Sequence, residues 1–260
     1  MTRQRRAARR RRRTGVCLAV TLALVLPWVA SSSVARAATT CAAPPGADPR
    51  LQTIDAQERL AWIDQRLTHV GRQARWWAWA WGGGIGASGV ASLIAVPLVS
   101  SSSRVDWYVS AGEAAVGVIP FLVAPLSVIG DAPKLHAAVA AVALPSGGDQ
   151  DAGLCALLAD AEQKLAAGAT DEALQQRWWI HAGNVIFNTG VVLFLGLGFH
   201  HWSAGIANGV AGAAVGEAII FTQPTGTVDD LAVYQRGHLD GATSAGDRSA
   251  AWGWFYRTTF

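Results

Sequence analysis

Charged residues are scarce in this sequence of 260 amino acids. They make up 15% of the chain, whereas an ordinary soluble domain carries about 25%. Lysine occurs only at Lys134 and Lys164, while hydrophobic residues make up 51%. This composition disfavours a typical soluble domain, and the length is sufficient for about four or five membrane spans.

The sequence also lacks the motifs on which enzyme and metal chemistry usually depends. It contains no CxxC, HExxH, GxSxG or GxxxxGK[ST] pattern. Residues 84–89 spell GxGxxG, but a dinucleotide site needs a strand before this motif, and here it lies inside an apolar run. His200 and His201 are adjacent but have no further ligands nearby in sequence. We therefore expect no enzyme activity, no cofactor and no metal.

The N-terminal segment carries a dense cluster of positive charge. Residues 1–37 contain nine arginines and no acidic residue, and an apolar stretch at 16–29 is followed by Ala35-Arg36-Ala37. This order is typical of a signal peptide cleaved after a small residue; an uncleaved N-terminal anchor is the alternative. The remaining chain has 12 basic and 18 acidic residues, a net charge of −6, which argues against a nucleic-acid partner.

Four apolar runs follow the signal segment. Each reaches the roughly 20 residues that a helix needs to cross a bilayer, and several of the 12 tryptophans lie at their edges, as in an interfacial aromatic belt. The alternating aromatic residues at the C-terminus are too few for a β-barrel. The predicted spans are about 77–99, 107–129, 179–199 and 203–222.

Targeting and loop lengths together predict a topology. The connections at 100–106 and 200–202 are short, so consecutive spans form antiparallel hairpins. We expect a multi-pass protein of the bacterial inner (cytoplasmic) membrane. The signal peptide predicts that the segment after it lies outside the cytoplasm. With four spans, both the N-terminal and the C-terminal segments are then extracytoplasmic. The arginines at 66, 72, 75 and 177 then lie on the outer side, against the positive-inside rule.

The cysteines agree with this topology. Cys17 lies in the signal segment, which leaves Cys41 and Cys155. They are separated by two predicted spans and hence lie on the same side of the membrane, where an oxidising compartment permits a disulfide. We predict a Cys41–Cys155 bridge; two free, buried thiols are the alternative.

Short matches recur along the chain and indicate an internal repeat. Residues 55–61 resemble 160–166, Arg75-Trp76-Trp77 matches residues 177–179, and Ala-Ala-Val-Gly occurs at 114–117 and 213–216. These matches predict an all-α membrane protein with two duplicated helical hairpins, each preceded by an extracytoplasmic amphipathic helix. The units are 38–130 and 131–222, followed by a tail, 223–260, with a short helix at 228–236. The first outer helix carries an apolar stripe at Ala56, Leu60, Ile63, Leu67, Val70 and Ala74.

The second unit carries both small and polar residues within its spans. Gly205, Gly209, Gly212 and Gly216 form a small-residue face that favours close helix packing. His181, Asn184 and Asn188 share one face of the third span, and Glu217 lies at a similar depth in the fourth. The equivalent positions of the first unit are Trp79, Gly82, Gly86 and Val118. Intramembrane ionisable groups are candidates for function, so this cluster either joins the helices or forms a proton, ion or ligand site.

Glu113 lies near the cytoplasmic end of the second span, where we expect it to reach the interface or pair with Arg104. Taken together, these features predict an envelope protein that is a structural or accessory component of a membrane complex. The alternative is a small oligomeric transporter or channel-like protein that uses the His/Asn/Glu cluster. The expected partners are the lipid bilayer and either further copies of the chain or another membrane protein.

Overall fold

The computed structural model describes residues 38–142 and 150–239, so the predicted signal peptide and most of the predicted tail lie outside the described residues. The described residues form helices and contain no strand. The helices are α1 (Ala56–Ala95), α2 (Arg104–Val123), α3 (Ser127–Val142), α4 (Gln150–Gln175), α5 (Trp178–Phe199), α6 (Trp202–Thr222) and α7 (Gly226–Gln235).

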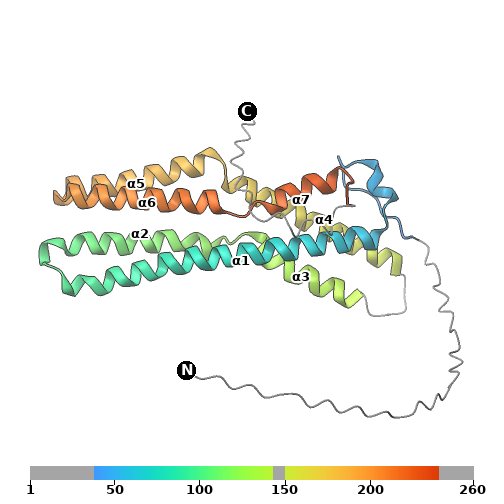
Figure 1. The fold of residues 1–260 in the computed structure, drawn as a ribbon, viewed down its shortest axis with the longest axis horizontal. Helices are drawn as coiled ribbons and strands as arrows, with labels where there is room; N and C mark the ends of the chain where they lie inside the picture. Colours follow the sequence, from blue (N-terminus) through green and yellow to red (C-terminus); the bar gives the residue numbers. More distant parts are fainter. Residues whose placement is uncertain (1–37, 143–149, 240–260) are drawn as a thin grey trace, which may run out of the picture. The chain divides into compact units, whose positions relative to one another are not determined.

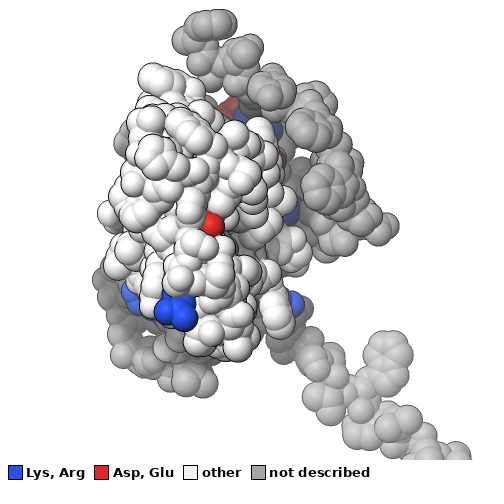
Figure 2. Space-filling view, turned by 90° about the vertical axis from the view of Figure 1, so that its left-hand side faces the viewer, with Lys and Arg blue, Asp and Glu red and all other residues white. Residues whose placement is uncertain are grey.

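Four of these helical stretches are long and apolar enough to cross a membrane. The second half of α1 pairs with α2 to form the first hairpin, and α5 pairs with α6 to form the second (Figure 1). Large apolar side chains on them are exposed, for example Leu98 at 80% and Leu122 at 74%. Figure 2 shows few charged atoms among the described residues at the end where the hairpins turn. The chain is therefore a multi-pass membrane protein whose apolar helices are suited to lipid.

Proline ends both returning helices. α2 ends at Val123, six residues before the predicted end of its span, because Pro125 follows and Ala124 has left the helical region (φ −139°, ψ 55°). The residue before a proline is pushed out of the α-helical conformation. Pro224 acts in the same way after α6, where Gln223 is extended (φ −60°, ψ 135°). Each break is followed by a second helix, α3 or α7.

The remaining helices form a compact base, which consists of the first half of α1 with α3, α4 and α7. The predicted apolar stripe of α1 is buried there against other helices. Its partners include Leu135 of α3, Leu158 of α4 and Tyr234 of α7. The predicted outer helix of the first unit is not a separate element, since α1 runs for 40 residues from the base into the first hairpin.

The short helix predicted in the tail is present as α7. It stops before Gly237, whose φ of 69° is a left-handed conformation that favours glycine. The helix starts two residues earlier than predicted, with Thr225 as the residue before it. α7 packs against α4 and extends the base beyond the second hairpin.

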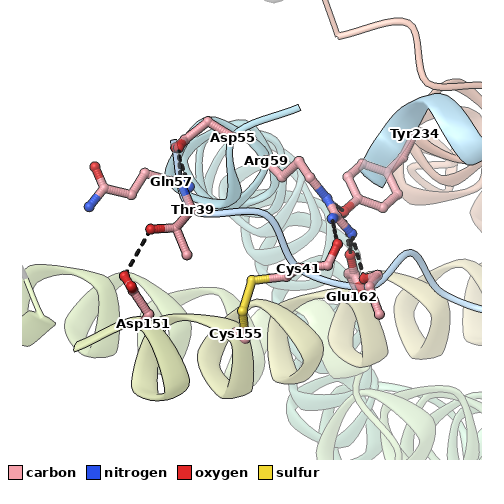
Figure 3. Close-up of a disulfide and its surroundings, with 10 residues drawn as sticks. Thr39, Cys41, Asp55, Gln57, Arg59, Asp151, Cys155, Glu162 and Tyr234 are labelled. Atoms are coloured by element: carbon pink, nitrogen blue, oxygen red, sulfur yellow. Dashed lines mark hydrogen bonds and ion pairs between the residues drawn. A yellow bond between two sulfur atoms is a disulfide. The ribbon is translucent and has the colours of Figure 1, made fainter. Parts of the chain in front are cut away.

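The predicted disulfide is also confirmed: Cys41 is bonded to Cys155, with the two Cα atoms 5.5 Å apart (Figure 3). Beside it the buried Arg59 donates hydrogen bonds to the Cys41 carbonyl oxygen (2.9 Å) and the Tyr234 hydroxyl (2.9 Å) and forms an ion pair with Glu162. These contacts join the segment around Cys41 to α1, α4 and α7. A buried arginine needs such partners because an unpaired buried charge is costly.

We expect loss of the disulfide to destabilise the base. Replacing Cys41 and Cys155 by Ser should lower the free energy of unfolding by about 3–5 kcal/mol, since the bridge closes a loop of more than 100 residues in the unfolded chain. Chemical denaturation of the purified protein in detergent measures this difference. Free thiols on both cysteines in protein taken from native membranes would contradict the bridge.

Candidate functional site between the two membrane hairpins

Glycines allow the two helices of the second hairpin to approach closely. A Cβ atom on Gly205 would lie 3.0 Å from the Val192 carbonyl oxygen, and one on Gly209 would lie 2.8 Å from the Asn188 carbonyl oxygen. A Cβ on Gly212 or Gly216 would collide with the side-chain amide of Asn188 or Asn184. All four predicted packing glycines therefore face α5, and the last two make room for its asparagines.

The predicted polar residues come together in this hairpin. Glu217 of α6 lies 2.6 Å from Nδ1 of His181 and accepts a hydrogen bond from Nδ2 of Asn184 (2.9 Å). Asn184 also donates to the Ala213 carbonyl oxygen at 2.9 Å. Asn188 donates to the backbone and side-chain oxygens of Asn184 (2.8 and 2.9 Å). Each member thus has a hydrogen-bond partner, as expected for polar groups on membrane helices.

Glu113 extends the cluster to the first hairpin. It forms no ion pair with Arg104 in the described part of the chain, so the pairing is not observed, while its reach to the interface stays a prediction. Its Oε1 atom is buried without a hydrogen-bond partner among the described residues. The same atom would lie 3.6 Å from a Cβ on Gly212, the glycine against which Asn188 rests. The carboxyl group of α2 thus reaches the polar face of the second hairpin.

Two further polar pairs connect the hairpins toward their turns. Ser110 of α2 donates to Oδ1 of Asn208 at 3.2 Å, and Asp106 lies 2.7 Å from Nδ1 of His201. The neighbouring His200 instead takes the left-handed conformation that ends α5 (φ 62°). The adjacent histidines therefore have different structural roles, and among the described residues no group of three or more His, Cys, Asp and Glu could hold a metal.

Together these polar groups form a row that we call the seam. Along α6 it extends from His201 to Glu217, which at 1.5 Å per residue is about 24 Å of a hydrocarbon core about 30 Å thick. At the base end, the indoles of Trp77 and Trp81 donate to the Thr222 hydroxyl (3.3 and 3.0 Å) and connect α1 to α6. The seam consists of Asp106, Ser110, Glu113, His181, Asn184, Asn188, His201, Asn208 and Glu217.

The first hairpin has no such row at its own helix contact. A Cβ on Gly82 would meet the Phe121 ring at 3.5 Å, and one on Gly86 would meet Val118 at 3.9 Å. A Cβ on Gly89 would come closer still, 2.9 Å from the Cβ atom of Ala114. The positions equivalent to Asn184, Asn188 and Glu217 are thus packed with apolar groups, and the seam is made by the second hairpin together with one face of α2.

The seam contains two pairs of ionisable groups. His181 and His201 each lie beside a carboxyl group, an arrangement in which one proton can be held between the two side chains. The side chains of His181 and Glu217 are each 28% exposed, so the pair is not sealed within the hairpin. The charged form of an isolated buried carboxyl is costly in an apolar medium, which favours a proton shared between neighbouring groups.

No protein-family model matches this chain, and no curated protein or solved structure matches it either.

Close packing at the glycines should be required for the second hairpin. We expect Gly209→Ala to destabilise the protein by roughly 1–3 kcal/mol, because the new methyl group would meet the Asn188 carbonyl oxygen and the Val192 side chain. Gly190→Ala is the matched control, since a Cβ there has no atom within 4 Å. Thermal unfolding in detergent compares them, and equal effects of the two changes would refute the packing role.

Proposed function

We propose that this chain is a bacterial envelope membrane protein that passes protons along the seam. The observation that supports this function is the row of carboxyl, imidazole and amide groups that follows the second hairpin and the facing side of α2 and extends over most of a bilayer thickness. Ionisable side chains on membrane helices commonly mark proton relays. The proposal makes the protein a small transporter or channel-like protein without enzymatic activity.

The chemistry of the seam suits protons better than larger ions. A metal ion needs several ligands arranged around one point, whereas a proton can move between neighbouring hydrogen-bonding groups. In the proposed relay, each carboxyl or imidazole group accepts a proton as it releases one to the next, and the asparagine amides only position these groups. Asp106 with His201 forms one end, Glu113 lies in the middle, and Glu217 with His181 forms the other end. Water bridges the steps at which the side chains do not touch.

The direction of the seam follows from the predicted signal peptide. With the N-terminal segment outside, the base is extracytoplasmic and both hairpin turns face the cytoplasm. His181 and Glu217 then form the outer end of the relay. The two hairpins are proposed to descend from one duplicated unit, which agrees with the matching proline breaks at Pro125 and Pro224 and with the helices that follow them. Only one unit then acquired the polar residues.

Proton flux into liposomes tests this function directly. With a potassium gradient and valinomycin setting the voltage, the purified protein should acidify the lumen. Glu113→Gln and Glu217→Gln should each reduce the proton flux to that of protein-free liposomes, because the amide of glutamine cannot take up and release a proton as a carboxyl group does. Glu58→Gln, at an exposed carboxyl of the base, should leave it unchanged. Wild-type flux in both seam variants, or none in the wild type, would refute the relay.

A second candidate function is favoured by the exposure of the membrane helices. Within each apolar stretch only 17–22% of the residues are buried, so a large surface is available to another membrane protein or to further copies of the chain. We propose on this basis a structural or accessory component of a membrane complex. In that case the hydrogen bonds of the seam only hold the helices together, and no proton passes along it.

The native mass of the protein in mild detergent separates the two candidates. If the protein is an accessory component, a foreign membrane protein should co-purify in a fixed ratio, and Glu217→Gln should weaken the complex or leave it intact without affecting any flux. Mass spectrometry of the purified particle identifies what is present. A particle that contains only this chain would contradict the accessory role.

A further inference from the structure

The end of α4 holds the first residues of two other helices. Asp171 accepts a hydrogen bond from the backbone N–H of Ser127, at the start of α3 (3.3 Å). The next residue, Glu172, accepts bonds from the backbone N–H groups of Thr227 (2.9 Å) and Val228 (3.2 Å) in the first turn of α7. Carboxyl oxygens suit such positions, whether or not the group is ionised, because the first N–H groups of a helix lack partners within the helix. One turn of α4 therefore holds both helices that follow the proline breaks.

Glu172 differs from Asp171 in its burial. It is 0% exposed, and its Oε1 atom has no hydrogen-bond partner in the described part of the chain. Its backbone carbonyl oxygen accepts a bond from Gln223, the residue between α6 and α7 (3.5 Å). A Cβ on Gly168, one turn earlier in α4, would lie 3.3 Å from Thr227. The carboxyl group is thus closed in by the junction of α4, α6 and α7.

The charged groups around this junction do not neutralise Glu172. The nearby acidic residues are Asp229 and Asp230 on α7 and Asp171, which precedes Glu172 on α4. The cation contributed by α1, Arg66, pairs with Asp230 at 3.4 Å. Burial raises the pKa of Glu172 to about 7, and the hydrogen bonds from Thr227 and Val228 offset only part of this shift. Desolvation of the negative charge therefore outweighs the two bonds that the carboxylate accepts.

We propose that Glu172 is a proton-operated latch: its neutral carboxyl group holds α7 docked on α4, and loss of the proton releases α7. Release would also free the end of α6, because Gln223 is bound to the backbone of the same residue and the connection between the two helices is only Gln223, Pro224 and Thr225. The latch responds to pH on the side of the membrane where the base lies. It goes beyond the proposed proton relay and holds whether or not the seam conducts.

The direction of the response follows from the pKa of Glu172. The docked state binds the proton more tightly than the released state, whose pKa is close to the ordinary value of 4.5. The stabilisation is therefore complete below the ordinary value and is lost as the pH rises through about 7. By this linkage the released fraction should increase roughly 50-fold between about pH 5 and about pH 7.5.

Amide hydrogen exchange in the full-length protein tests the latch. The protection of α7, corrected for the intrinsic pH dependence of exchange, should fall by about 50-fold from about pH 5 to about pH 7.5. Glu172→Gln keeps the shape and cannot ionise, so α7 should stay protected at both values. Asp171→Asn is the matched control and should retain the pH response of the wild type. Exchange in α1 shows whether each variant is folded.

Three results would overturn the proposal. The first is a wild-type protein in which the corrected protection of α7 does not change with pH. The second is protection that increases toward about pH 7.5. The third is a folded Glu172→Gln variant that keeps the wild-type pH response, which would assign the titration to another group. Because none of these readouts involves flux, the latch and the relay can fail independently.

Discussion

Polar groups on membrane helices must find partners within the protein, because lipid offers none. This constraint determines how the two hairpins meet. Their helices carry apolar residues over most of their surfaces, and lipid is as apolar as leucine, so hydrophobic burial gives little reason for them to associate. The hydrogen bonds from Ser110 to Asn208 and between Asp106 and His201 instead stabilise the contact between the two hairpins. The glycines of α6 bring the asparagines of α5 into the same row.

The base holds the hairpins in register outside the apolar segment. α1 belongs to both parts as one continuous helix, so the orientation of the first hairpin is set by the packing of α1 on α3 and α4. The second hairpin is held differently, since α5 and α6 are each separated from the base by a short break. Its position therefore depends on its hydrogen bonds to α1 and α2 and on the junction of α4 and α7, where the proposed latch at Glu172 acts.

Much of this arrangement could be predicted from the sequence. The apolar runs and the spacing of Ala56 to Ala74 predicted four membrane helices and a buried stripe, because periodicity reports directly which face is buried. The shared compartment of Cys41 and Cys155 predicted their bond. Within α5 and α6, His181 and Glu217 could be matched in depth because a tight turn fixes the register of a hairpin.

The contacts between hairpins could not be predicted in the same way, because no short loop fixes the register of α2 against α6. Asp106, Ser110 and Glu113 are spaced so that they share one helical face, and this signal was present in the sequence. The sequence did not show that Asn208 and His201 lie opposite them. Cross-linking of Ser110→Cys to Asn208→Cys in native membranes tests the seam most directly. The account predicts a bond within one chain and none for Val116→Cys with Asn208→Cys; failure of the first pair to cross-link, or bonding only between chains, would contradict it.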